Sequence, residues 1–299
     1  MILTIGTSEA GGTFHSQALA IAGLFNRMHP DVEMRMVHSG LASIDNANLL
    51  DKGEIDFGFM ASNWIGRAKD GIAPFTRRIA LRMVSPANAG PLFFVTLARS
   101  PLKNVGELRG KRVAVGVRGS GMVEHVRTIF NVLGIPFDRF TPVYLGFAEG
   151  AEALIAGDVN AQFHPPIPNR VMTNLSERAD VRVIPYVPGQ IEKILSEVSF
   201  YRGVTIKKGA FRGVVEDLPQ VAVVNVLVTH ERVQEKVVRD MVKTIVENLD
   251  TLPQINPLFK GLKDLFEPLR SKGAAAFEFG AVPLHPGALR AYREAGWLT

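Results

Sequence analysis

The stretch Ile2-Leu3-Thr4-Ile5-Gly6-Thr7-Ser8-Glu9-Ala10-Gly11-Gly12-Thr13 joins a short apolar strand to a glycine-rich turn, and a helical pattern follows it. The free N–H groups at a helix start, with the positive end of the helix dipole behind them, bind carboxylates and phosphates. The spacing from Gly6 to Gly11 imitates a nucleotide-binding P-loop, but Gly12 stands where such a loop has its lysine. The turn therefore predicts anion binding without phosphoryl chemistry.

Strands and helices alternate after this turn. Apolar residues at helical spacing continue to Met28, and the pattern ends ahead of Pro30. Residues 32–37 and 55–60 have strand patterns, and Ser43 can cap a short helix between them. This alternation predicts right-handed βαβ units and a parallel sheet.

The same rhythm returns in the second third of the chain. A strand pattern at residues 112–117 leads into the turn Arg118-Gly119-Ser120-Gly121 and then into a helix. The segment Lys52-Gly53-Glu54-Ile55-Asp56 is echoed by Ala156-Gly157-Asp158-Val159-Asn160, which follows a predicted helix at residues 148–156. The repeat predicts two similar α/β lobes, each with a glycine-rich turn after its first strand.

Two apolar segments, residues 90–98 and 221–228, look like paired strands on which the chain crosses between the lobes. Lobe one then consists of residues 1–90 and 222–299, and lobe two of residues 91–221. The expected fold class is two-lobed α/β, with a mostly parallel sheet flanked by helices in each lobe. The two glycine turns are expected to face each other across a cleft.

Composition excludes several classes of protein. The 299 residues are 46% hydrophobic and 21% charged, and the formal net charge of +5 is spread over scattered basic pairs. Nucleic-acid binding is not expected, because it requires a clustered basic face. The absence of cysteine excludes disulfides, thiolate metal sites and a cysteine nucleophile. The apolar runs are far shorter than the roughly 20 residues of a membrane helix.

No basic and apolar leader precedes the first strand. Two explanations stay open: a secretory signal has been removed and Met1 added, or the native protein is cytoplasmic.

Several segments, spread nearly from end to end, share one order and spacing with a known family. They are Gly6 to Thr13 with Phe14, residues 49–56, residues 110–116, Gly119-Ser120-Gly121, Phe200-Tyr201, residues 282–288 and Ala291-Tyr292-Arg293-Glu294. Together they resemble the TAXI group of TRAP-transporter solute-binding proteins. The resemblance implies a type II periplasmic-binding-protein fold that closes on a small organic anion, often an amino acid or dicarboxylate. It also implies a periplasmic, monomeric protein that delivers this anion to sodium-driven membrane subunits.

The chain departs from the family pattern at three places. Phe14-His15 stands where paired tyrosines are common, Gly40-Leu41-Ala42-Ser43 replaces Thr-Gly-Gly-Ser, and Met122 replaces a threonine. These differences predict a bulkier and less polar carboxylate than an amino acid.

The glycine turns supply the first candidate contacts. Thr13 and the N–H groups of residues 12–14 are expected to hold an anion in lobe one, and Ser120 with Gly121 in lobe two. Arg118 can pair bidentately with a carboxylate, which lysine does less well. The alternatives are that the glycines only permit a tight turn and that Arg118 is a surface charge.

Further candidates follow the third strand of each lobe, because ligands of open α/β sheets bind beyond the carboxyl ends of the strands. Trp64 is expected to line a pocket wall, the alternative being that it only packs against its neighbours. For Ser43 the alternative is that it only caps a helix. No catalytic residue, metal ligand or cofactor is predicted. The predicted ligand-binding residues are Gly12, Thr13, Phe14, His15, Ser43, Ser62, Asn63, Trp64, Arg118, Gly119, Ser120, Gly121, Met122, Phe163 and His164.

An enzyme is the alternative. If His15, His38 and His164 converge, they could bind a metal or do acid–base work in a cytoplasmic decarboxylase or hydrolase of an aromatic or dicarboxylic acid. No His-x-x-x-His spacing supports this, and a lone histidine is usually a surface residue. The nearby carboxylates of Asp45 and Glu149 suit a first helical turn or a helix surface. A binding protein without catalysis is therefore the preferred interpretation.

Overall fold

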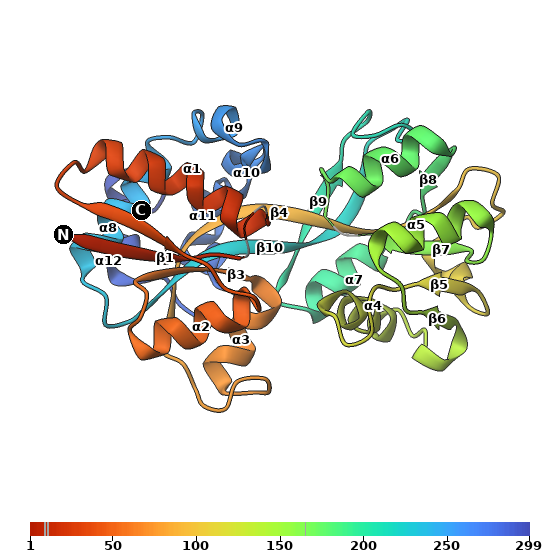
Figure 1. The fold of residues 1–299 in the computed structure, drawn as a ribbon, viewed down its shortest axis with the longest axis horizontal. Helices are drawn as coiled ribbons and strands as arrows, with labels where there is room; N and C mark the ends of the chain where they lie inside the picture. Colours follow the sequence, from red (N-terminus) through yellow and green to blue (C-terminus); the bar gives the residue numbers. More distant parts are fainter. Residues whose placement is uncertain (9, 11, 165) are drawn as a thin grey trace. The chain divides into compact units, whose positions relative to one another are not determined.

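The computed structural model describes residues 1–8, 10, 12–164 and 166–299. The chain forms two compact units. Unit 1 consists of Met1–Ala89 and Val224–Thr299, and unit 2 of Gly90–Val223. The chain passes from one unit to the other twice, once inside strand β4 (Leu81–Leu97) and once inside strand β10 (Leu218–His230) (Figure 1).

The sheet of unit 1 has the strand order β2-β1-β3-β10-β4. Strand β1 (Ile2–Gly6) is parallel to β2 (Glu33–Val37) and to β3 (Phe57–Ala61), and β10 is antiparallel to β3. Figure 1 shows α1 on one side of these strands and α2 with α3 on the other. The helices of unit 1 are α1 (Thr13–Met28), α2 (Ser43–Lys52), α3 (Ser62–Asp70), α8 (Glu235–Val246), α9 (Leu252–Ile255), α10 (Leu262–Phe266), α11 (Pro268–Lys272) and α12 (Pro286–Glu294), with 3-10 turns η3 (Pro257–Phe259) and η4 (Gly273–Phe277).

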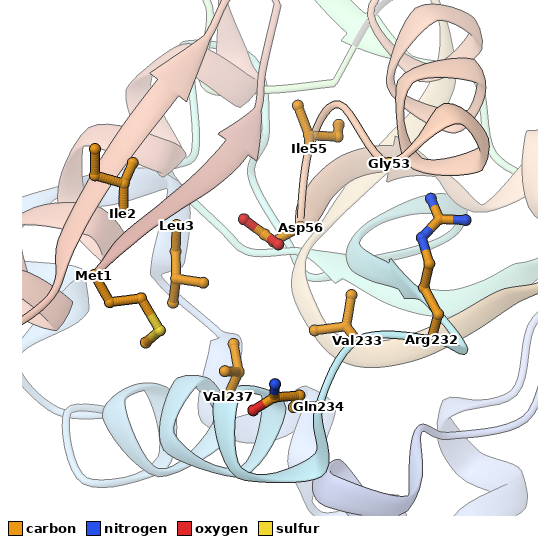
Figure 2. Close-up of a pocket in the computed structure, with 10 residues that line it drawn as sticks. All are labelled: Met1, Ile2, Leu3, Gly53, Ile55, Asp56, Arg232, Val233, Gln234 and Val237. Carbon is orange, nitrogen blue, oxygen red and sulfur yellow. The ribbon is translucent and has the colours of Figure 1, made fainter.

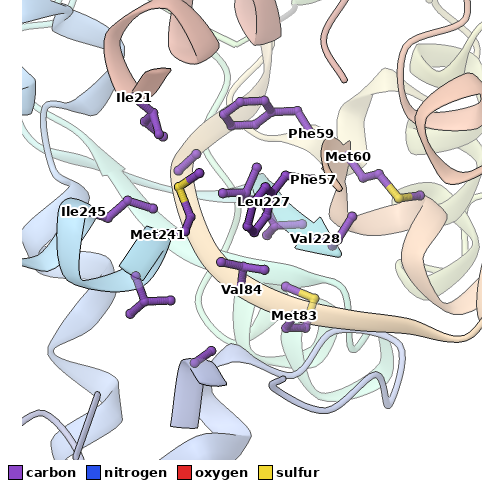
Figure 3. Close-up of a cluster of buried hydrophobic side chains, with 14 of the residues drawn as sticks. Ile21, Phe57, Phe59, Met60, Met83, Val84, Leu227, Val228, Met241 and Ile245 are labelled. Atoms are coloured by element: carbon purple, nitrogen blue, oxygen red, sulfur yellow. The ribbon is translucent and has the colours of Figure 1, made fainter. Parts of the chain in front are cut away.

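The core of unit 1 lies between its central strands and the helices α1 and α8. Figure 3 shows Phe57 and Phe59 of β3 with Leu227 of β10 among Ile21 of α1 and Met241 of α8. All five side chains are buried. Burying an apolar side chain of this size contributes about 1.5–3 kcal/mol, so each of these five side chains stabilises unit 1.

The sheet of unit 2 repeats this order as β6-β5-β7-β4-β8. Strand β5 (Arg112–Ala114) is parallel to β6 (Thr141–Val143) and to β7 (Ala161–His164), and β4 is antiparallel to β7 and β8 (Val181–Val183). The remaining elements are β9 (Tyr201–Ile206), which pairs with β10, the helices α4 (Gly121–Val132), α5 (Phe147–Ala156), α6 (Arg170–Arg178) and α7 (Gln190–Glu197), and the 3-10 turns η1 (Val105–Leu108) and η2 (Phe137–Arg139).

The repeated segments, residues 52–56 and 156–160, have the same structure in the two units. Gly53 and Gly157 end α2 and α5 in the left-handed conformation, with φ of 76° and 85°. Three residues later, a side-chain oxygen accepts a hydrogen bond from the first strand of the same unit. Asp56 accepts from the N–H of Thr4 at 2.8 Å, and Asn160 accepts from the N–H of Arg112 at 3.0 Å.

Some elements differ from the sequence prediction. Strand β5 ends at Ala114 instead of residue 117, because Gly116 has a φ of +100° that no strand allows. Strand β4 begins at Leu81, well before the apolar run that predicted it. None of the described helices is long and apolar enough to span a membrane.

Candidate ligand-binding site

In unit 1, helix α1 begins at Thr13, and its N-cap Gly12 has no side chain that could accept a hydrogen bond. Its first-turn N–H groups and the positive end of its dipole therefore lie at the loop that follows β1. The N–H of His15 donates to Ser8 Oγ at 3.3 Å. Thr13 is exposed and Gly12 is half-buried. Glu9 and Gly11, which belong to the predicted turn, lie outside the described residues.

A hydrogen-bond network fixes the loops after β1 and β2. The carbonyl oxygen of Thr7 accepts from Ser39 Oγ at 2.8 Å and from Asn46 Nδ2 at 3.1 Å. Thr7 Oγ1 lies 3.2 Å from His38 Nδ1, and the rings of His15 and His38 have centroids 5.1 Å apart. The carboxyl edge of β1 is therefore a polar, internally bonded surface.

The histidines do not assemble a metal centre. Within the part of the chain that the structure describes, no three side chains of His, Asp or Glu come together as a metal site. His15 and His38 are neighbours in unit 1, whereas His164 is buried in unit 2, stacked on Phe93 with ring centroids 5.3 Å apart.

Phe14 lies in the core of unit 1. Its ring stacks on Phe59 at a centroid distance of 5.7 Å, and 8% of the residue is exposed. Phe14 can offer a ligand its backbone N–H, while its side chain packs beneath the turn.

The hydroxyl groups of Ser43 and Ser62 are buried and accept hydrogen bonds from the backbone. Ser43 Oγ accepts from the N–H of Ala61 at 3.0 Å, and Ser62 Oγ accepts from the N–H of Val224 at 3.1 Å. Both serines thus hold the strands of unit 1 together.

The two residues after Ser62 differ from each other. Asn63 has a buried Oδ1 without a hydrogen-bond partner among the described residues. Trp64 is half-buried, packs edge-on against Phe75 at a ring distance of 6.4 Å, and carries the guanidinium of Arg67 at 5.1 Å from its ring. The structure thus shows packing contacts for Trp64 within unit 1.

In unit 2, the turn before α4 brings polar groups to the carboxyl end of β5. Ser120 is the N-cap of α4, and its Oγ is buried with no partner in the described residues. Gly119 adopts a φ of +79° and Gly121 begins the helix. A Cβ at Gly116 would lie 3.1 Å from Ser120 Oγ and 3.0 Å from Met122 Cβ, so glycine is needed for this close approach.

Arg118 lies in the same turn and is exposed. Its guanidinium stacks on the ring of Tyr144, 4.0 Å from the ring centroid. Stacking occupies the face of the guanidinium and leaves its in-plane N–H groups available to an anion. Sequence reasoning missed Tyr144, although its place directly after β6, at the carboxyl ends of the strands, was a usable signal.

Phe163 and His164 end strand β7 inside unit 2. Phe163 is fully buried and contacts Phe94 at a ring distance of 4.8 Å. Together with His164 on Phe93, these contacts anchor β7 to the crossover strand β4.

Helix α4 also carries a buried histidine that the sequence analysis did not select. His125 Nδ1 lies 2.7 Å from Tyr201 Oη, and burial lowers the pKa of His125 to about 4. Burial also raises the pKa of Tyr201 well above its usual value. Both groups are therefore neutral at pH 7, and a neutral pair is the form that tolerates burial.

Unit 1 has two adjoining pockets at the opposite, amino-terminal edge of β1, of about 360 and 390 Å³. Figure 2 shows Asp56 between Leu3 and Val233 in the first of them. Its charged groups already serve the fold, since Asp56 accepts from Thr4 and Arg232 donates to the carbonyl oxygen of Asp51 at 3.1 Å. None of the predicted ligand-binding residues lines either pocket.

The strand order shared by both units, with a crossover strand antiparallel to the third strand, defines an α/β periplasmic-binding-protein fold. The crystal structure of the sulfonate-binding protein SsuA from Methylobacillus flagellatus KT, described as a putative sulfonate ABC transporter component, has this fold, with a TM-score of 0.52 and 14% identity. The match covers 99% of this chain and 85% of that one. Residues 5–296 match the NMT1-like family, and the chain belongs to that family.

Two other solved structures are similar at lower TM-scores. The aliphatic sulphonate-binding protein SsuA from Escherichia coli has a TM-score of 0.48 and 16% identity, covering 98% of this chain and 83% of that one. The probable amino-acid-binding protein ytmK from Bacillus subtilis has a TM-score of 0.49 and 13% identity, covering 88% and 97%. Both are described as binding proteins. The predicted fold class is confirmed, and the family agrees with the prediction of a non-enzymatic protein.

Proposed function

We propose that this chain is a solute-binding protein that captures a small organic carboxylate and delivers it to the membrane subunits of a TRAP-type secondary transporter. The observation that carries the proposal is the N-terminus of α4. There the turn before α4 carries a buried Ser120 Oγ without a partner in the described residues, the N–H groups of the first helical turn, and Arg118, whose guanidinium stacks on Tyr144. These are three kinds of hydrogen-bond donor suited to one anion.

The physical chemistry of this turn favours a carboxylate. Helix N–H groups and a hydroxyl donate to one carboxylate oxygen each, while a guanidinium matches both oxygens at once. Without an anion, the buried hydroxyl of Ser120 forgoes a hydrogen bond, which costs about 1–3 kcal/mol. A bound carboxylate would recover this free energy.

Unit 1 offers a matching turn. The N–H of His15 donates to Ser8 Oγ, and the N–H groups of Thr13 and Phe14 at the start of this 16-residue helix are proposed as a second set of donors. In our proposal this turn is a second anion-binding turn, and ligand binding stabilises the ligand-bound form of the protein.

The expected ligand is a bulky and weakly polar carboxylate. Positions 14, 15 and 122 carry phenylalanine, histidine and methionine where the TAXI group commonly has tyrosines and a threonine. Fewer hydroxyl groups near the anion contacts disfavour a small, highly polar ligand such as an amino acid.

The TAXI resemblance supports the remaining parts of the proposal, which are a periplasmic location, a monomeric state and a membrane-embedded transporter as partner. The NMT1-like family assignment and the periplasmic-binding-protein fold are consistent with a solute-binding role.

A thermal-shift screen tests the proposal. The panel contains aromatic and aliphatic carboxylates, dicarboxylates, amino acids and alkanesulfonates, and each carboxylate is paired with its neutral primary amide. We expect one or more carboxylates to raise the Tm while their amides do not. Conversion of a stabilising acid to a product, followed by NMR of the mixture, would instead indicate an enzyme.

A further inference from the structure

The first helix of each unit carries one buried polar side chain at the same position. Helix α1 starts at Thr13 and helix α4 at Gly121, and the fifth residue is Gln17 in one and His125 in the other. Gln17 is 0% exposed and His125 is 7% exposed. A buried polar group needs a hydrogen-bond partner to offset its loss of hydration, so the partners of these two side chains matter.

In unit 1 the partner belongs to crossover strand β4. Gln17 Nε2 donates to Asn88 Oδ1 at 2.8 Å, and Asn225 Nδ2 of β10 donates to the same oxygen at 3.0 Å. An amide oxygen has two lone pairs, so Asn88 Oδ1 is saturated by these two donors. Three elements, α1, β4 and β10, therefore meet at one atom.

In unit 2 the partner lies on β9, which pairs with crossover strand β10. His125 Nδ1 and Tyr201 Oη are 2.7 Å apart, and Tyr201 pairs in register with Val223 of β10. The two rings also pack against each other, with centroids 5.6 Å apart.

Both hydrogen bonds involve strands close to the residues at which the chain passes from one unit to the other. Asn88 precedes Ala89, the last residue of unit 1 on β4, and Val223 is the last residue of unit 2 on β10. One buried hydrogen bond thus connects the first helix of unit 1 to crossover strand β4, and another connects the first helix of unit 2 to β9, the partner of crossover strand β10.

We propose that Gln17 and His125 are positioning residues that fix the N-termini of α1 and α4 relative to the crossover strands. The inference rests on the proposed function, because the helix N-termini that these residues position are the proposed anion contacts. A helix N-terminus binds an anion well only when its N–H groups are held in place before the anion arrives. Loss of either hydrogen bond leaves the fold intact and loosens the first turn of that helix.

The test uses two variants, one for each unit. Tyr201→Phe removes only Oη and keeps the ring contact with His125. Asn88→Leu removes the shared acceptor of Gln17 and Asn225, and Asn88→Asp restores an acceptor oxygen.

Tyr292→Phe is the matched control for Tyr201→Phe. Tyr292 is equally buried and donates to the carbonyl oxygen of Val84 at 2.7 Å, an acceptor that lies on β4 and not on α1 or α4. Both Tyr-to-Phe variants lose one buried hydrogen bond, so a purely structural role gives them the same effects.

The first readout needs no ligand. NMR order parameters of the amides of residues 121–124 are expected to fall in Tyr201→Phe and those of residues 13–16 in Asn88→Leu, with the other helix unchanged each time. Asn88→Asp is expected to stay close to wild type. Unchanged order parameters in both helices, or the same change in Tyr292→Phe, would overturn the inference.

The second readout is calorimetric titration with sodium benzoate and sodium succinate as probes. We expect Tyr201→Phe and Asn88→Leu to raise Kd about three- to tenfold for a probe that binds the wild type, and Tyr292→Phe to leave Kd unchanged. Equal Kd values in all variants would contradict a positioning role. If wild type binds neither probe, that result counts against the proposed function, and the order parameters alone decide the inference.

Discussion

The side-chain nitrogen of Asn46 lies 3.1 Å from the carbonyl oxygen of Thr7 and 2.9 Å from that of Phe59. Helix α2 thereby ties the loop after β1 to strand β3. Gly58 makes room for this amide, because a Cβ there would lie 3.1 Å from Asn46 Cβ. In unit 2 the corresponding side-chain amide belongs to a strand instead of a helix.

Gln162 of β7 donates to the carbonyl oxygen of Phe147 at 2.8 Å, and the matching helix position is Gly150. A Cβ at Gly150 would lie 2.8 Å from Gln162 Nε2. Both units therefore have a side-chain amide between helix and strand. The helix carries it in unit 1, and the strand carries it in unit 2.

Asn46→Ala is expected to destabilise the protein by ~3 kcal/mol, because two buried carbonyl oxygens lose a donor at once. Chemical denaturation measures the loss. Asn131→Ala, at an exposed position on α4, is the control and is expected to change stability by less than about 0.5 kcal/mol. Equal effects of the two substitutions would show that the Asn46 hydrogen bonds contribute nothing.

Ala42→Gly is expected to stabilise the protein by about 1 kcal/mol. Ala42 has a φ of 45° and a ψ of −103°, a conformation that costs a residue with a Cβ about 1–3 kcal/mol and costs glycine little. Thermal unfolding of the ligand-free protein measures the gain.

Ala295→Gly is the matched control for this substitution. Ala295 is exposed and has a φ of −86°, so glycine there gains nothing and loses about 0.5–1 kcal/mol through chain entropy. A loss of stability in both variants would mean that Ala42 is not strained.

His125 makes stability depend on pH. Burial lowers its pKa from 6.5 to about 4, so the unfolded chain takes up a proton at a higher pH than the folded chain. Its contribution is complete above pH 6.5 and is lost as pH falls from 6.5 towards 4. Between pH 7 and pH 5 this loss amounts to about 2 kcal/mol.

Denaturation of wild type and His125→Gln at both pH values isolates this effect. The remaining groups that titrate in this range, including His230 and His285, whose pKa values burial also lowers, are common to both proteins. The variant is expected to lose about 2 kcal/mol less than wild type between pH 7 and pH 5. Parallel losses would show that His125 is not neutralised by burial.

The local part of this fold was predictable from sequence. Gly53 and Gly157 end helices because the left-handed conformation suits glycine, and a strand follows each. Helix α8 likewise shows apolar residues at helical spacing, with Val238, Met241 and Ile245 buried. The α/β rhythm and its repeat then sufficed for the fold class.

The long-range part was not predictable. Gln17 meets Asn88 and His125 meets Tyr201 across 71 and 76 residues of chain, and no local pattern records such a contact. Phe14 was predicted as a ligand contact because it follows Gly12 and Thr13, and the sequence did not indicate that its ring stacks on Phe59. The periodicity of one helix cannot tell which neighbour its polar residue faces.

Arg118→Gln is expected to weaken carboxylate binding about tenfold or more, because a charge-assisted hydrogen bond contributes about 1.5–3 kcal/mol. Tyr144→Leu removes the ring on which Arg118 stacks and is expected to give a smaller loss, and Tyr144→Phe almost none. Calorimetric titration with the best carboxylate of the screen measures all three. Unaltered affinity in Arg118→Gln would make Arg118 a surface charge.

The central claim is that the N-terminus of α4, with Ser120, binds a carboxylate group. The most direct measurement is the Tm of wild type and Ser120→Ala with a stabilising acid and with the amide of that acid. We expect that the acid stabilises wild type, that the amide does not, and that Ser120→Ala loses most of the shift although its ligand-free Tm is no lower than that of wild type. An equal shift with acid and amide, or an undiminished shift in Ser120→Ala, would contradict it.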